Sequence, residues 1–94
     1  MQFTRRLREP VRNGEITTSI RIWQSPRVQV GRRYRMEDGH IQIESIQEIC
    51  IADVTSNLAR ESGFSGVADL LKVAKHGPGA HVYLVRFHFV PAPI

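Results

Sequence analysis

The chain contains a single cysteine, Cys50, so no intrachain disulfide can form and the fold must rest on its hydrophobic core. Its 94 residues leave room for one small domain, which we expect to span residues 1–94. Hydrophobic residues make up 41% and charged residues 23% of the chain, a balance typical of globular proteins rather than disordered ones. No apolar run approaches the roughly 20 residues that span a bilayer, and Met1–Arg12 lacks the apolar stretch of a signal peptide. We therefore expect a cytoplasmic protein with no membrane partner.

Hydrophobic periodicity and turn signals predict a short helix, several strands, two helices and a final strand. Pro10 suits the first position of the first helix, and Asn13-Gly14 suits its end. The strands are expected over Thr17–Trp23, Val28–Met36 with a break at Gly31, His40–Asp53 and His81–Val90, and the later helices over Thr55–Ser62 and Ser65–Lys75.

The strands indicate a curled sheet. Glu37-Asp38-Gly39 is typical of a tight hairpin turn, and the alternation of isoleucines after His40 slips by one residue near Ser45, which predicts a bulge or a bend. In the last strand one face is expected to carry Tyr83, Val85, Phe87 and Phe89, and the other Val82, Leu84, Arg86 and His88. The predicted fold class is α+β: a small, mostly antiparallel β pseudo-barrel flanked by two or three short helices.

Positive charge is concentrated in the first third of the chain. Residues 1–35 hold nine arginines against two glutamates, a net charge of +7, although the whole chain carries only +4. One-sided basic charge favours a polyanionic partner, most simply nucleic acid, and the alternative is a solvated arginine surface with no such partner. Arg32, Arg33 and Arg35 flank Tyr34 and are candidates for a phosphate-contacting edge, the alternative being a charged hairpin rim. The arginines of the N-terminus either extend that patch or belong to a mobile end.

The sequence shows no pattern typical of a metal or cofactor site. The four histidines and Cys50 fall in no ligand spacing, so we expect no metal site and no cofactor. Cys50 lies in an isoleucine-rich stretch and is interpreted as a buried small hydrophobic residue.

A polar row follows Gly14. On a strand, Thr17, Ser19 and Arg21 share one face that ends at Trp23, and this face would offer hydrogen-bond donors to a phosphate or a nucleobase edge if it lines a cleft. Trp23 would then stack on a base. The alternative is the exposed polar face of an ordinary strand, with Trp23 closing the end of the core.

Several short motifs in a fixed order resemble the ASCH family of the PUA-like superfamily. They are Gly14–Arg21, Gly31 with Tyr34, Ala59–Phe64, the helix containing Leu70-Leu71, and Val82–Phe87. The resemblance covers nearly the whole chain. It implies a PUA-like pseudo-barrel with a cleft that recognises RNA or a nucleotide. Some small members of the family are amidohydrolases acting on acetylated cytidine, and ribonuclease activity is attributed to others.

The resemblance also implies which residues would carry catalysis. The amidohydrolases use a lysine, a hydroxyl and a glutamate; Ser19 matches the hydroxyl and Glu61 is nearest to the glutamate, but Ile16 occupies the lysine position. Isoleucine supplies neither a base nor a cation, which lowers the expectation of hydrolysis. Our leading hypothesis is therefore an RNA- or nucleotide-binding module. A small hydrolase using Ser19 and Glu61, and a protein-interaction domain using the apolar last strand or the proline tail, are the alternatives.

Overall fold

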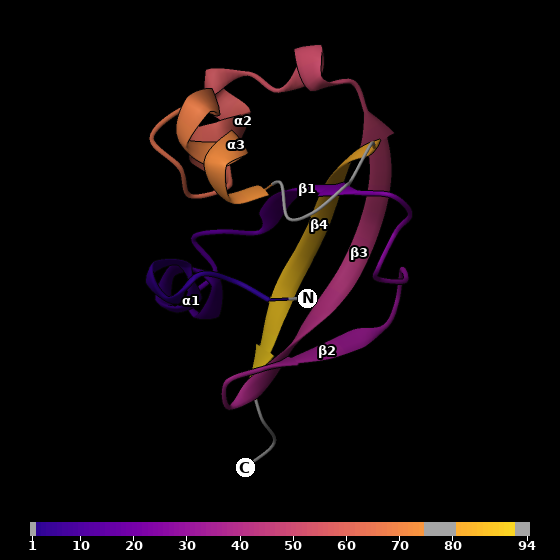
Figure 1. Ribbon diagram of the computed structural model, residues 1–94. Helices are drawn as coiled ribbons and strands as arrows, with labels where there is room; N and C mark the ends of the chain where they lie inside the picture. The colour runs from indigo at the N-terminus through magenta and orange to yellow at the C-terminus, as the bar shows by residue number, and fades with distance from the viewer. Residues whose placement is uncertain (1, 75–80, 92–94) are drawn as a thin grey trace.

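Four strands form one antiparallel sheet in the order β1-β4-β3-β2 (Figure 1). The structure is a computed structural model that describes residues 2–74 and 81–91. In chain order the elements are α1 (Arg5–Arg12), β1 (Thr18–Trp23), β2 (Arg33–Met36), β3 (Gly39–Ile49), a 3₁₀ turn (Ile51–Asp53), α2 (Ser56–Glu61), α3 (Val67–Ala74) and β4 (His81–Pro91). The α+β class with a small antiparallel sheet and a few short helices is confirmed. None of the described helices is long and apolar enough to cross a membrane.

The two faces of β4 divide the core into two clusters, as the alternation predicts. We call the side of Tyr83, Val85 and Phe87 the inner face of the sheet, and the side of Val82 and Leu84 the outer face. The inner cluster gathers aromatic and aliphatic side chains from the N-terminal segment, α1, all four strands and the connections on either side of β1: Phe3, Leu7, Val11, Ile16, Trp23, Val28, Met36, Ile41, Ile43, Tyr83, Val85 and Phe87. The outer cluster joins β1 and β4 to α2 and α3 through Ile20, Ile22, Val54, Ala59, Leu70, Val82 and Leu84.

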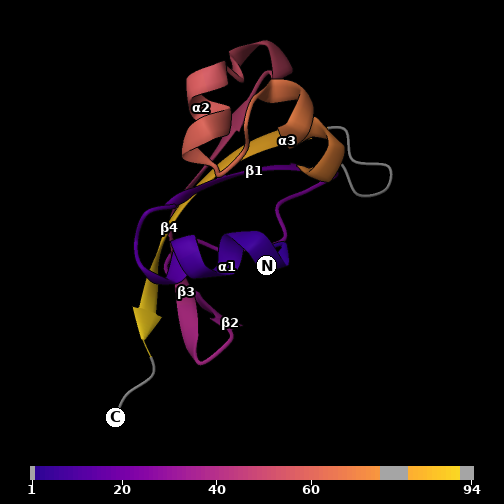
Figure 2. The same ribbon diagram turned by 90° about the vertical axis from the view of Figure 1, so that its left-hand side faces the viewer.

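The helices cover only part of the outer face. Figures 1 and 2 show α2 and α3 together at one end of the sheet and the β2–β3 hairpin at the other, with α1 between these levels. The outer cluster accordingly includes Val82 and Leu84 of β4 but stops before Arg86, which is exposed. Among residues 2–74 and 81–91, no apolar helix layer covers the outer face beyond Leu84, toward the hairpin, and we call this region the open half.

The predicted bulge is confirmed. The pairing of β3 with β4 shifts register between Ile43, which faces Phe87, and Ser45, which faces Arg86. The extra residue, Glu44, lies exposed at the bulge. A bulge increases local twist, so it lets the sheet curl around the inner cluster while each side of the strand keeps its polarity.

Helix α1 differs from the prediction at its start. Pro10 does not open the helix; the helix begins at Arg5, and Pro10 lies in its last turn. The reason is packing, because Leu7 and Val11 lie one turn apart and are both buried in the inner cluster. The predicted end is confirmed, with Asn13 as the C-terminal cap and Gly14 at a φ of 84°.

Two strands are shorter than predicted. β2 covers only Arg33–Met36, because the chain turns at Gly31, whose φ is 83°, and Val28 enters the inner core. β3 ends at Ile49. The Asp53 carboxylate then accepts a hydrogen bond from the Cys50 amide at 2.9 Å as the 3₁₀ turn begins.

Cys50 therefore leaves the sheet. The prediction that it is a buried core residue is wrong: it is exposed.

The later helices lie close to their predicted bounds. Thr55 caps α2 by accepting a hydrogen bond from the Leu58 amide at 3.1 Å, and Gly63, with a φ of 94°, follows the helix. The start of α3 is held differently from the prediction, since the backbone amide of Ser65 donates to Asp69 at 3.2 Å. That bond, more than any other contact, lowers the pKa of Asp69. The predicted end of this helix at Lys75 lies outside the described residues.

Gly39 provides a test of the hairpin packing. A Cβ atom at Gly39 would meet the Val90 carbonyl oxygen at 2.5 Å and the Phe89 ring. We expect Gly39→Ala to lower the free energy of unfolding by about 1–3 kcal/mol, measured by urea denaturation. Gly66→Ala is the matched control, because no atom lies within 4 Å of its added Cβ, and its effect should be well below that. Equal effects of the two changes would contradict the close approach at Gly39.

Candidate nucleic-acid interface

The polar row after Gly14 points to the inner face, as its alternation predicts, with one exception. Ser19 and Trp23 are buried and Arg21 is half-buried, whereas Thr17 precedes β1 and is exposed. Thr17 contributes its backbone instead, since its carbonyl accepts a hydrogen bond from the Phe87 amide at 3.0 Å. Three of the four residues therefore come together, but on a face that the core and the N-terminal segment already occupy.

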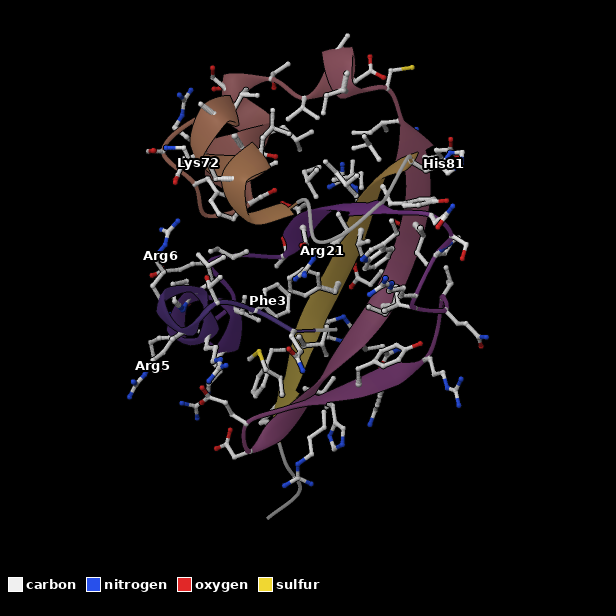
Figure 3. The ribbon with its side chains drawn as sticks, viewed as in Figure 1. Phe3, Arg5, Arg6, Arg21, Lys72 and His81 are labelled. Atoms are coloured by element: carbon white, nitrogen blue, oxygen red, sulfur yellow. The ribbon has the colours of Figure 1, made fainter. Side chains whose placement is uncertain are left out.

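Arg21 is the centre of this arrangement. Its Nε donates to Ser19 Oγ at 2.8 Å, its Nη2 donates to the Gln2 carbonyl at 2.5 Å, and its guanidinium lies 5.1 Å from the centre of the Phe3 ring. Figure 3 shows Arg21 and Phe3 on the same side of the sheet. No carboxylate forms an ion pair with Arg21 among the described residues. Burial lowers the pKa of Arg21 to about 10, so the group stays charged at neutral pH.

Aromatic side chains continue the inner face beyond Arg21. Trp23 is 8% exposed and its ring lies 5.9 Å from that of Tyr83, so it closes the core rather than presenting a free stacking surface. Burial, and secondarily the charge of Glu48, raises the pKa of Tyr83. His81 lies at the start of β4 (Figure 3), with its Nδ1 3.0 Å from Glu48 Oε2.

The structure does not bring the hydrolase residues together. Ser19 points to the inner face, whereas Glu61 is exposed on α2, which packs against the outer face. Within the described chain, the only hydrogen-bond partner of Ser19 Oγ is Arg21, a cation rather than a base. A buried hydroxyl pair does lie near α2, because Thr18 Oγ1 and Ser62 Oγ are 3.4 Å apart. That pair has no carboxylate or imidazole bonded to it in the described residues.

The arginines of β2 lie on the open half of the outer face. Arg33 pairs with Gln42 and Arg35 with His40, and these partners face His88 and Val90 of β4. Residues paired across antiparallel strands project to the same side of a sheet, so two cross-strand rows form, Arg33–Gln42–His88 and Arg35–His40–Val90. Arg86 of β4 pairs with Ser45 of β3, and these two residues form a third row on the same face. Arg32 precedes β2 and is exposed.

Four residues of these rows were missing from the sequence-based site: His40, Gln42, Arg86 and His88. The signal for Arg86 and His88 was present in the alternation of the last strand, which placed both on one face. Finding the whole group also required the hairpin register, which aligns each β2 arginine with a β3 residue.

The open half is positively charged. Its rows contain three arginines and two histidines, and Glu44 at the bulge is the nearby acid, with Oε1 2.7 Å from His88 Nδ1. One of the arginines, Arg33, donates to Gln42 Oε1 at 3.0 Å, whereas Arg35 and Arg86 make no side-chain hydrogen bond or ion pair within the described residues. Guanidinium groups without a partner on the exposed face of a sheet are free to bind phosphate.

The arginines of α1 serve a different purpose. Arg6 donates to the Gly63 carbonyl at 3.1 Å and pairs with Asp69 at 3.4 Å, and Arg12 pairs with Asp38 at 3.1 Å. Arg8 donates to the Phe3 carbonyl at 3.2 Å. Arg6 and Arg12 thus connect α1 to other parts of the fold, whereas Arg8 bonds within the N-terminal segment through its Nε alone. Arg5, by contrast, projects from α1 into solvent (Figure 3).

The described residues contain no group of three histidine, cysteine, aspartate or glutamate side chains that would hold a metal ion. Comparison with protein-family models, with curated proteins and with solved structures finds no match for this chain. The ASCH resemblance and what it implies therefore stay predictions, and the geometry of the outer face carries the functional argument.

The role of Arg21 is open to a direct test. We expect Arg21→Lys to lower the free energy of unfolding by about 1–2 kcal/mol, because an ammonium cannot reproduce the planar fork that joins Ser19 to Gln2. Amide hydrogen exchange near Phe3 should also accelerate. Arg60→Lys, on the exposed surface of α2, is the control and should change stability little. Unaltered stability and exchange in Arg21→Lys would show that the N-terminal segment is held by other contacts.

Proposed function

We propose that the protein binds single-stranded RNA on the open half of its outer sheet face. The observation that carries this proposal is the set of cross-strand rows that presents Arg33, Arg35 and Arg86 beside His40 and His88. Guanidinium groups bind phosphate, and guanidinium and imidazole planes stack on unpaired bases. A curved sheet with polar side chains at strand spacing suits a flexible strand better than a rigid duplex.

The open half is a different surface from the cleft that the sequence predicts around Ser19 and Arg21. Arg21 and Ser19 are bonded to each other, and Trp23 is buried, so these residues support the fold. The basic residues of β2 keep the role predicted for them as a phosphate-contacting edge. Their partners on β3 and β4 extend that edge into a surface.

We also infer that the curled sheet is a PUA-like pseudo-barrel in a cytoplasmic protein. Two features support the first part: the bulge between Ile43 and Ser45, and an inner cluster enclosed by strands, α1 and the β1–β2 connection. The ASCH resemblance supplies the association of such a fold with RNA, while the rows of the outer face provide the surface.

The salt dependence of RNA affinity tests the proposal. Replacing Arg33 and Arg35 together with alanine should weaken binding of a short single-stranded RNA. It should also reduce the magnitude of the slope of log affinity against log salt by about 1.4. Each phosphate contact on a single strand releases about 0.7 counterion when it forms, and the variant lacks two such contacts. Fluorescence anisotropy over a range of salt concentrations measures both quantities.

A double variant of Arg5 and Arg60 is the matched control. Both arginines are exposed and lie outside the open half. Their replacement with alanine removes two positive charges, as the change of Arg33 and Arg35 does. Loss of Arg5 and Arg60 should leave the slope within experimental error. Absence of RNA binding by the unmodified protein at low salt, or an equal loss in the two double variants, would refute binding at this face.

A further inference from the structure

A polar hollow lies beside the proposed RNA-binding face. Its volume is about 350 Å³, and it is lined by Gln2, Phe3, Arg8, Arg35, Met36 and Glu37. Arg35 belongs both to this lining and to an outer-face row. Phe3 and Met36 place the hollow on the inner side of β2, so an RNA strand bound across the open half would reach it by passing round the β2 edge of the sheet.

The lining combines nonpolar and polar side chains. Phe3 and Met36 are each only 6% exposed and belong to the inner cluster. The polar groups around them include two guanidinium groups, one carboxylate and one amide. A flat nucleobase combines the same features, with an apolar face and hydrogen-bonding edges.

Several of these polar groups have no partner within the described chain. The Arg35 guanidinium, the Glu37 carboxylate and the Gln2 amide make no side-chain hydrogen bond or ion pair there, although Arg35 and Glu37 line the same hollow. Arg8 uses only its Nε, on the Phe3 carbonyl. The neighbouring Asp38, by contrast, is paired with Arg12. The hollow thus keeps donors and acceptors available to a ligand.

Glu37 lies in the tight turn that joins β2 to β3. Glu37 has a φ of 52° and is the one residue other than glycine with a positive φ among the described residues. Glycine adopts this left-handed region with little penalty, whereas a glutamate there is strained. The turn itself requires this conformation, because Glu37 is the first of two residues between the paired Met36 and Gly39 and a two-residue hairpin needs a positive φ there; the turn thereby holds the Glu37 carboxylate at the border of the hollow.

We propose that the hollow binds a single unpaired guanine base of the RNA, an inference that rests on the proposed RNA binding. Guanine places two adjacent donors, N1–H and the N2 amino group, on its Watson–Crick edge, where one carboxylate accepts both. Its O6 and N7 acceptors suit an arginine fork. Glu37 accepts from the donor edge, and Arg8 donates to the acceptors through its Nη groups, while Arg35 contacts phosphate at the border of the hollow. No other common base combines these two edges.

The test compares short oligouridines whose central nucleotide is uridine, cytidine, adenosine or guanosine. The unmodified protein should bind the guanosine version on the order of tenfold more tightly than the others. In Glu37→Gln this ratio should fall toward one. The ratio is the informative quantity, because removing a negative charge raises the affinity for every oligonucleotide alike. Glu61→Gln is the matched control and should keep the guanosine preference.

A second variant separates binding from folding. Glu37→Gly should raise the midpoint of thermal unfolding, since glycine relieves the positive φ, and should still lose the guanosine preference. Equal affinity of the unmodified protein for all four oligonucleotides, or a preference that survives in both Glu37 variants, would overturn the guanine pocket while leaving RNA binding by the open half intact. Failure to bind any oligonucleotide would instead refute the proposed function itself.

Discussion

The two-sided burial of β4 is the constraint on which the rest of the structure depends. β4 lies between β1 and β3, and its side chains alternate between two hydrophobic clusters. Val85 and Phe87 are fully buried on the inner side, while Val82 and Leu84 pack under α2 and α3 on the outer side. In a chain of this size without a disulfide, most of the stabilisation must come from such burial. Past Leu84 the outer side changes to Arg86 and His88, so one strand supports the core and also presents the open half.

The distribution of arginine contacts shows why net charge alone is a poor guide to a binding surface. The first third of the chain carries most of the positive charge, yet Arg6, Arg8 and Arg12 bond to carbonyl or carboxylate groups of the protein itself. Arg21 is half-buried against Phe3. The arginines that remain uncommitted lie mainly around β2 and on β4. The surface relevant to a polyanion is therefore smaller than the composition suggests, and it includes a residue, Arg86, from the acidic remainder of the chain.

The elements that follow from local periodicity were predictable, and those that depend on tertiary packing were not. Alternation located both faces of β4 and the bulge near Ser45, and capping residues located α2. The start of α1 was missed because Leu7 becomes an anchor only when the sheet lies beneath it. Cys50 was misplaced because β3 ends at Ile49, where the Asp53 carboxylate accepts a hydrogen bond from the Cys50 amide and a 3₁₀ turn begins. Within the site, alternation placed Ser19 and Arg21 on one face, but only the three-dimensional structure shows that Phe3 and Gln2 cover them.

The position of β2 at the border of the sheet has a consequence for solubility. A terminal strand leaves one side of its backbone without a neighbouring strand, and such borders invite pairing between molecules. β2 is only four residues long and carries Arg33 and Arg35, whose like charges repel a second copy approaching in register. The guanidinium groups that we propose to contact RNA thus also oppose edge-to-edge pairing of two copies through β2. Neutral residues at both positions would remove this repulsion and leave the backbone edge of β2 open to pairing between molecules.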